Sequence, residues 1–389
     1  MLVGVNVGVS VGVSVGVPVG VWVGVSVAVW VGVVVIAALV LPLPSHGTLV
    51  AEQANFQQLA EQGLVQTHAN WWNAQAGWYM GRRNGDPPVA SLWSSYPLLE
   101  LVDAIAIADP TPANKAFVDT TFTQAEGFWD PTIEGTGGVT WLYGLHNTGN
   151  AYFDDAGWWG LAYLDAYRAT GKKRWLWDAG RVLTYLNRYA WDPGSGGMWW
   201  DVTHEHKTSE PLGAATLIAA TLYRIQHKKY FLDVAARLLK WADTNTQNPK
   251  AGNLYGRSAT DGTVMDYVEG MMVAAHVELC KATKQKAYCT QAEQIARASL
   301  AQFPVLADWA PETDVVYLRW MLDLYSYDKN STWYALAYEN AKHAAANARD
   351  ASGFWSLRWD GGTTIDQTLY TQTATLELFA WLAATPPPA

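Results

Sequence analysis

One form of segment recurs four times along the chain, and it constrains the fold more than any other feature. Each copy has a polar, often lysine-rich turn, an aromatic residue at the eighth place and an alanine at the twelfth. The copies are RATGKKRWLWDA at 168–179, RIQHKKYFLDVA at 224–235, KATKQKAYCTQA at 281–292 and SYDKNSTWYALA at 326–337. A fainter copy surrounds Phe117. Recurring segments of this kind indicate a fold built from one repeated supersecondary unit.

The repeated unit is predicted to be a helical hairpin. Apolar residues recur at helical spacing on both sides of each turn, as at Ile218 and Leu222 before one turn and at Ala235 and Leu239 after it, which favours helices over strands. Twelve helices are predicted, at 52–80, 95–109, 113–127, 156–170, 172–189, 211–227, 229–243, 266–284, 286–303, 312–326, 331–348 and 366–384.

Six such hairpins can close into an all-α (α/α)6 barrel, in which inner helices alternate with outer ones. An open solenoid is the alternative. The last predicted helix is rich in Leu, Phe and Trp and has no polar capping face, which favours closure because the terminal unit of an open solenoid needs such a face.

The loops that join the hairpins are predicted to lie on one rim of the barrel. They contain strand-like, glycine-rich pieces at 130–141, 191–206, 253–266 and 352–366. Their aromatic residues are Trp141, Trp191, Trp199, Trp200, Tyr255, Trp355 and Trp359. A rigid scaffold often presents functional residues on its loops, and Trp and Tyr are favoured at ligand-binding surfaces. The rim is therefore predicted to bind sugar, with ordinary packing as the alternative for each single ring.

Two adjacent carboxylates, Asp154 and Asp155, stand beside Tyr152, Trp158 and Trp159 at a predicted helix start. Aromatic surroundings make it costly to ionise both. N-capping with a favourable helix dipole is one interpretation. Catalysis is the other, because neighbouring residues can reach the roughly 5–5.5 Å carboxyl separation of retaining glycosidases, whereas inverting enzymes need about 6.5–9.5 Å. The pair thus favours a retaining mechanism.

A series of motifs resembles glycoside hydrolase family 76, the family of endo-α-1,6-mannanases. In order, they are FDDAGWWGLAYLDAYRATG, GGMWWD, TLIAATLYR, DYVEGMMVAAHVELCKAT and GFWSLRWDGGTTIDQTLYTQTATLELFAWLA. The resemblance runs from about residue 90 to the end, and the acidic pair is its most specific motif. It implies an (α/α)6 barrel in which Asp154 attacks the anomeric carbon and Asp155 protonates the leaving oxygen.

Residues in and around these motifs are expected to contact the sugar: Tyr152, Trp158, Trp159, Trp199, Trp200, Asp201, Tyr267, Glu269 and Arg319. The chain departs from the family pattern at Ala156 and Val268, where the family often has Asn, and at Glu269, where it has Gln. Glu269 is expected to raise the pKa of a neighbouring Asp, with an ordinary polar residue at a helix start as the alternative. Arg319 either orients a carboxylate or forms a structural salt bridge.

The chain is divided at residue 50. Residues 1–50 form a low-complexity Val/Gly segment without a charged side chain, and residues 51–389 are predicted to form a single catalytic domain. Val27–Leu43 resembles the apolar core of a secretory signal, with small residues at Ser45–Gly47 for cleavage. We expect a secreted, extracellular protein. An uncleaved membrane anchor, or a mistaken upstream start, is the alternative.

Secretion agrees with the two cysteines. Cys280 and Cys289 lie at the end of one predicted helix and the start of the next, where antiparallel neighbours can meet, so we predict one disulfide. Two buried free thiols are the alternative.

The charge of the chain excludes some partners. A formal charge of −9 offers nothing to phosphate backbones, so nucleic acid is not expected. No cofactor and no metal are expected, because the His204–His206 stretch has no third spaced ligand.

The expected function is a retaining, endo-acting α-mannosidase that hydrolyses α-1,6-linked mannan through a covalent mannosyl-enzyme intermediate, as a monomer. The alternatives are a cell-wall transglycosylase on the same site, a non-catalytic glycan-binding protein, and another sugar-acting enzyme of this fold, such as an epimerase or a lyase.

Overall fold

The computed structural model describes residues 43–133, 137–144, 151–304, 306, 310–361 and 367–389. The unit that contains them spans Leu41–Ala389, and its first helix starts at His46, ahead of the predicted boundary at residue 51. The proposed cleavage positions therefore lie at the start of a helix that Ser45 caps through its side chain. Within the described residues, no helix is both long and apolar enough to cross a membrane.

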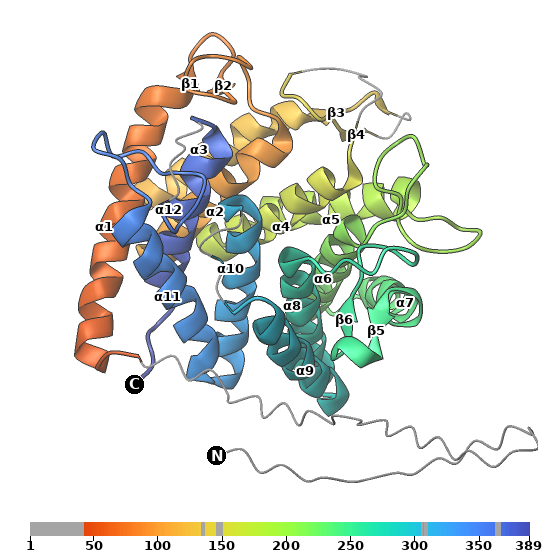
Figure 1. Ribbon diagram of the computed structural model, residues 1–389. Coiled ribbons are helices and arrows are strands. Elements are labelled where there is room, and N and C mark those ends of the chain that lie inside the picture. The colour runs from red at the N-terminus through yellow and green to blue at the C-terminus, as the bar shows by residue number, and fades with distance from the viewer. Residues whose placement is uncertain (1–42, 134–136, 145–150, 305, 307–309, 362–366) are drawn as a thin grey trace, which may run out of the picture. The chain divides into compact units, whose positions relative to one another are not determined.

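Twelve α-helices occur in the described part of the chain, as predicted (Figure 1). They are α1 (His46–Trp71), α2 (Leu92–Ala108), α3 (Pro112–Ala125), α4 (Phe153–Thr170), α5 (Lys173–Tyr185), α6 (Ser209–Gln226), α7 (Lys229–Asn245), α8 (Asp266–Thr283), α9 (Lys286–Gln302), α10 (Pro311–Asp328), α11 (Ser331–Asn347) and α12 (Leu369–Ala384). A π-helical turn, Leu186–Ala190, extends α5.

The even-numbered helices form a closed inner ring. Each packs against the next, and α12 packs against α2, so the ring closes and the solenoid alternative fails. The odd-numbered helices lie outside, which makes the fold an (α/α)6 barrel. Five hairpins are consecutive in sequence, whereas the sixth pair joins α1 to α12. The two ends of the domain thus complete the barrel together.

The repeated segment marks the turn at which an inner helix ends. Its fourth residue is Gly171, His227, Lys284 or Lys329, and each adopts a left-handed conformation, with φ between 54° and 72°. The backbone N–H of each donates to the carbonyl four residues earlier, which closes the helix end. The aromatic residue then fastens the outer helix, as Trp175 does by stacking on Tyr163 with 5.8 Å between ring centroids.

Small residues let the inner helices approach one another. A Cβ on Gly157 of α4 would lie 2.5 Å from the Cβ of Ala214 on α6. A Cβ on Gly270 of α8 would lie 2.9 Å from the Cα of Tyr317 on α10. Both glycines are therefore required by the packing of the ring.

The first predicted helix, 52–80, is wrong at its C-terminal end. α1 stops at Trp71, and the following residues form a hairpin of β1 (Trp72–Asn73) and β2 (Trp78–Tyr79). The Asn73 side chain accepts hydrogen bonds from the backbone of Gln75 and Ala76, and this turn replaces helical hydrogen bonds. Two similar hairpins precede inner helices: β3 (Trp129–Asp130) with β4 (Gly138–Val139), and β5 (Gln247–Asn248) with β6 (Leu254–Tyr255).

Several aromatic residues predicted for a sugar-binding rim belong to the core instead. Tyr255, Trp355 and Trp359 are at most 2% exposed. The Trp359 indole donates to Thr375 of α12, and Trp355 packs edge-on against Phe379. These rings attach the loops to the inner helices.

Candidate active site

One end of the barrel collects carboxyl groups. Because the inner helices run parallel, their N-termini lie at the same end, where the loops from the outer helices arrive. Four consecutive inner helices have acidic residues in their first turn: Asp154 and Asp155 on α4, Glu210 on α6, Asp266 and Glu269 on α8, and Glu312 and Asp314 on α10. No outer α-helix has one in its first turn within the described residues. The positive ends of the helix dipoles favour anions at these positions.

The acidic pair is held by the loop that precedes α6. The backbone N–H of Phe153 donates to the carbonyl of Trp200 over 2.7 Å, and Val202 donates to Ala151 over 3.2 Å. This backbone pairing places the Trp200 indole so that its Nε1 donates to Oδ2 of Asp154 over 2.9 Å. The other oxygen of Asp154, Oδ1, accepts from the backbone N–H of Asp155 over 3.0 Å.

The two carboxyl groups have different surroundings. Burial raises the pKa of Asp154 to about 7, against the hydrogen bond from Trp200. Burial and the neighbouring Asp154 charge raise the pKa of Asp155 well above its usual range. Within the described residues, no hydrogen bond reaches the Asp155 carboxyl. Asp154 is therefore the group that ionises first, and Asp155 keeps the proton.

Glu210 is a third carboxylate that acts on the pair, and it was not predicted from the sequence. It lies in the first turn of α6 and is 3% exposed, and its charge raises the pKa of Asp154. Its Oε1 accepts from Nε of the half-exposed Arg257 over 3.3 Å. The predicted helix began at residue 211, which left Glu210 in a loop. Its position at the start of an inner helix, like that of the acidic pair, is the signal that could have found it.

Glu269 does not have the predicted influence on the pair. It is fully buried, and its Oε1 accepts from the backbone N–H of Tyr255 over 2.7 Å. It thus fastens β6 to α8, and the carboxylate that raises the pKa of Asp154 is Glu210. The two other departures from the family pattern, Ala156 and Val268, are also buried, at 0% and 1% exposed.

The predicted sugar-contacting aromatic residues divide into two groups. Tyr152 and Trp200 are half-buried and pack together at the pair, with 5.2 Å between ring centroids. Tyr267 is half-buried and packs on Trp158. By contrast, Trp158 and Trp159 are at most 2% exposed and belong to the core. The prediction of a direct sugar contact is not supported for these two.

Two further predicted contact residues lie on the loop of Trp200. Trp199 is half-buried and stacks on His204, with 5.4 Å between ring centroids. Asp201 is half-buried, and its Oδ1 accepts from the backbone and the hydroxyl of Thr203. That turn orients the loop, so Asp201 contributes to the position of Trp200.

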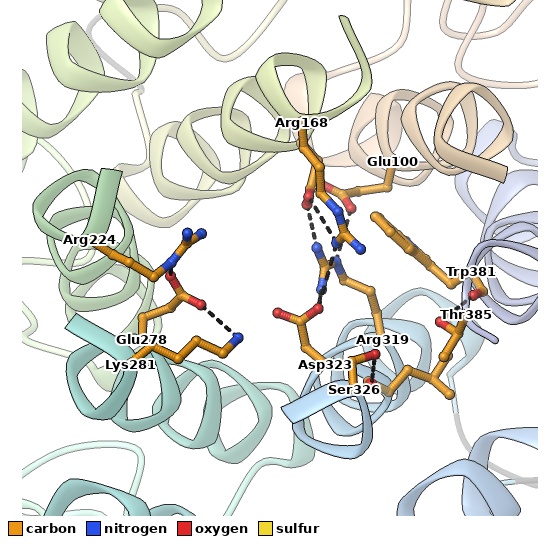
Figure 2. Close-up of polar contacts among 12 residues, drawn as sticks. Glu100, Arg168, Arg224, Glu278, Lys281, Arg319, Asp323, Ser326, Trp381 and Thr385 are labelled. Carbon is orange, nitrogen blue, oxygen red and sulfur yellow. Dashed lines mark hydrogen bonds and ion pairs between the residues drawn. The ribbon is translucent and has the colours of Figure 1, made fainter. Parts of the chain in front are cut away.

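Arg319 lies in a buried ionic cluster rather than at the acidic pair. Its Nη2 donates to Asp165 over 2.6 Å, and ion pairs reach Glu100 at 3.5 Å and Asp323 at 3.6 Å. Figure 2 shows Arg319 between Glu100 and Asp323, with the ring of Trp381 beside it. The structure therefore supports the salt-bridge alternative.

Residues near the other ends of the inner helices form the rest of this polar interior. Arg168 pairs with Asp323 as well as with Asp165. Arg224 of α6 and Lys281 of α8 both contact Glu278 (Figure 2). Basic residues in the last turns of α4, α6 and α8 complement the helix dipoles there, as the acids do at the first turns.

The predicted disulfide is present. Cys280 of α8 and Cys289 of α9 are bonded, with their Cα atoms 5.3 Å apart. In the described residues, no group of three or more His, Cys, Asp or Glu side chains is placed to hold a metal ion.

Comparison with known proteins agrees with this geometry. The model of glycosyl hydrolase family 76 matches residues 140–386, which include the acidic pair and nine of the twelve helices. The chain belongs to glycosyl hydrolase family 76. Among curated proteins, no sequence matches it.

Solved structures share the fold. A family 76 α-mannanase from Bacteroides thetaiotaomicron has a TM-score of 0.77 at 20% identity, over 87% of this chain and 98% of that one. An α-1,6-mannanase from Salegentibacter sp. has a TM-score of 0.69 at 17% identity, over 84% and 99%. An inactive variant of that enzyme, with two consecutive aspartates replaced by asparagine, was solved with α-1,6-mannotriose. A cellobiose 2-epimerase from Bacillus thermoamylovorans has a TM-score of 0.64 at 13% identity, over 85% and 99%. The barrel alone therefore does not select one reaction.

Proposed function

We propose that this family 76 chain is a retaining, endo-acting α-mannosidase that hydrolyses α-1,6-linked mannan. The observation that carries the proposal is the unequal acidic pair. Asp154 accepts two N–H hydrogen bonds, whereas Asp155 accepts none from the described residues and holds its proton more tightly. Such a division of roles between two carboxyl groups is what glycoside hydrolysis requires.

In the first step, an Asp154 oxygen attacks the anomeric carbon of a mannose unit. The bond between that carbon and the glycosidic oxygen breaks, and the Asp155 carboxyl gives its proton to the leaving oxygen. In the second step, water attacks the same carbon, the ester to Asp154 breaks, and the Asp155 carboxylate accepts the proton from water. The indole of Trp200 stabilises the Asp154 carboxylate before attack and after its release.

The choice of mannan as substrate is supported by family membership and by the α-mannanases that share the fold. The Salegentibacter enzyme also became inactive on replacement of two consecutive aspartates. In this chain, Asp154 and Asp155 are such a pair at the start of an inner helix.

The test is to incubate the purified chain with α-1,6-, α-1,2- and α-1,3-linked mannans and to analyse the products by size. Release of short oligosaccharides from the α-1,6-linked polymer is expected. Release of monosaccharide only, or no products from that polymer, would contradict the proposal. Added acceptor sugars reveal a transglycosylase, because products longer than the substrate then accumulate.

Export from the cell is the second part of the proposal. The disulfide between Cys280 and Cys289 supports it, because such bonds persist in oxidising compartments. Expression with the native N-terminus, followed by terminal sequencing of the protein in the medium, tests export. Retention of the whole chain inside the cell would contradict it.

A further inference from the structure

A groove on the outer wall of the barrel is lined by aromatic and basic residues. Its volume is about 830 Å³, and it follows α5 and the start of α7. It runs from Lys173, in the first turn of α5, to Tyr189 in the π-helical turn that extends that helix. None of the acidic residues at the barrel end lines it.

Two aromatic side chains in this groove are exposed to an unusual degree. Trp177 is 66% exposed and Tyr230 is 47% exposed, which makes them the most exposed aromatic residues of the described chain. Trp177 is held beside Arg181, whose guanidinium carbon lies 5.5 Å from the ring centroid. A large ring that packing does not bury is available to stack on a ligand.

The charges of the groove are opposite to those of the whole protein. The chain has a formal charge of −9, yet the described lining contains four cations and no carboxylate. Arg181 is neutralised by Glu126 and Asp178. Lys173, Arg188 and Lys228 are exposed, and no ion pair joins them to any described residue. Unpaired cations at both ends of the groove therefore favour an anionic ligand.

We propose that this groove binds acidic glycans, that is, polysaccharide chains that carry phosphate or carboxylate groups. The flat faces of Trp177 and Tyr230 would contact sugar rings, and Arg188, Lys173 and Lys228 would pair with the anionic groups. The glycan part of the proposal rests on the function proposed above. Tyr185, which lines the groove near the end of α5, packs on Phe153, the residue before the acidic pair. Their ring centroids are 5.7 Å apart. A polymer bound along α5 thus approaches the barrel end that holds Asp154.

The test measures binding of the Asp154→Asn chain, which is not expected to cleave the ligand, by isothermal titration calorimetry. Three ligands are compared: a phosphate-bearing mannan, a glucuronate-bearing mannan and a neutral α-1,6-mannan. At least one acidic polymer is expected to bind about tenfold more tightly than the neutral one, and its affinity falls as salt is added. The acidic polymer that binds more tightly identifies the anionic group. Equal affinity for all three polymers, without salt dependence, would overturn the proposal.

Substitutions in the groove locate the binding. Trp177→Ala and Arg188→Gln, each added to the Asp154→Asn chain, are expected to weaken acidic-polymer binding by about tenfold. Lys240→Gln, an exposed cation of α7 outside the groove, is the matched control and should leave affinity unchanged. Unchanged affinity in both groove variants, with native melting temperatures, would overturn the proposal.

Two further measurements distinguish glycan binding in the groove from catalysis at the barrel end and from self-association. In the native background, Trp177→Ala should raise KM for an acidic polymer but leave hydrolysis of a neutral mannotetraose unchanged. If the chain hydrolyses no mannan, the proposed function is wrong, but the binding measurement still shows whether the groove binds acidic glycans. If sedimentation shows a dimer that Trp177→Ala dissociates, the groove is a protein interface and the inference is wrong.

Discussion

Two carboxyl groups of the inner helices, Asp323 in the interior and Asp155 at the barrel end, differ in whether a cation accompanies them. In the interior, burial favours the neutral form of Asp323, but Arg319 and Arg168 outweigh it and lower the pKa of Asp323 to about 2. At the barrel end, the Asp155 carboxyl has no such partner, and burial with the charge of Asp154 raises its pKa well above the usual range. The same low-polarity surroundings therefore produce an ion at one place and a proton donor at the other.

Burial alone therefore does not define a catalytic carboxyl. Glu100, Asp103 and Glu377 are also buried with raised pKa values. They face Arg319 in the interior, whereas Asp154 is half-buried at the end where the loops meet. Charge balance serves stability in the first group and chemistry in the second. Substitutions at the two places should separate these two roles.

Neutralising the acidic pair should abolish activity without loss of stability. Asp154→Asn and Asp155→Asn are each expected to lower kcat by about 10³-fold or more, because one removes the nucleophile and the other the acid. Melting temperatures should stay the same or rise, since each amide replaces a carboxyl group whose ionised form is costly to bury. Steady-state kinetics and calorimetry check both, with the exposed Asp233→Asn as the control. Activity at the native level in either variant would contradict the assignment.

Removing the interior cation should instead affect stability. Arg319→Met leaves Glu100, Asp165 and Asp323 without their shared partner and is expected to cost about 3–5 kcal/mol of unfolding free energy. Urea denaturation measures this. Arg168→Gln, at a side chain that is 44% exposed, should cost less than about 1 kcal/mol. A similar small loss for Arg319→Met would show that the cluster does not depend on it.

Substitutions around Asp154 should move its pKa in opposite directions. Trp200→Phe removes a donor to the carboxylate and raises this pKa, so the acidic limb of kcat/KM shifts to higher pH. Glu210→Gln removes a nearby negative charge and lowers it, so the limb shifts to lower pH. Each shift is expected to be about one pH unit. If the acidic limb shifted in the same direction in both variants, its assignment to Asp154 would be excluded.

The interior carboxyl groups should make stability fall as pH rises. Burial raises the pKa of Glu100 to about 8. In the unfolded chain, the pKa of a Glu side chain is about 4.3. Between these values the folded chain keeps a proton that the unfolded chain releases, so unfolding is favoured by up to about 1.4 kcal/mol per pH unit. Melting temperatures measured from about pH 5 to 8 should decline. The decline should be less steep for Glu377→Gln, because that variant lacks one of the interior carboxyl groups with a raised pKa. Melting temperatures that rise over this range would contradict the charge balance.

The fold was largely predictable because the repeated segments coincide with helix ends. The left-handed residues and the following aromatic residues have a fixed place in each copy. The prediction failed after Trp71, where apolar residues continue at helical spacing through the β1–β2 hairpin. There, the Asn73 turn outweighs the apolar pattern, and side-chain hydrogen bonds of that kind are not visible in periodicity.

The site was predictable only in part. The acidic pair was found from its unusual chemistry, but its hydrogen bond to Trp200 joins residues 46 apart in sequence. Local patterns hold no information on such a contact. Glu269 and Glu210 show the same limit, because both lie at the start of inner helices. Glu269 accepts a hydrogen bond from β6 and is a structural group, whereas Glu210 raises the pKa of Asp154.

The role of Asp154 as nucleophile is tested most directly by the configuration of the first sugar released. Proton NMR during early hydrolysis of an α-1,6-mannan by the native chain reports the anomer before mutarotation. Attack by Asp154 and then by water inverts the anomeric carbon twice, so the α-anomer is expected first. Initial release of the β-anomer would show direct attack by water and would contradict the assignment of Asp154 as the nucleophile.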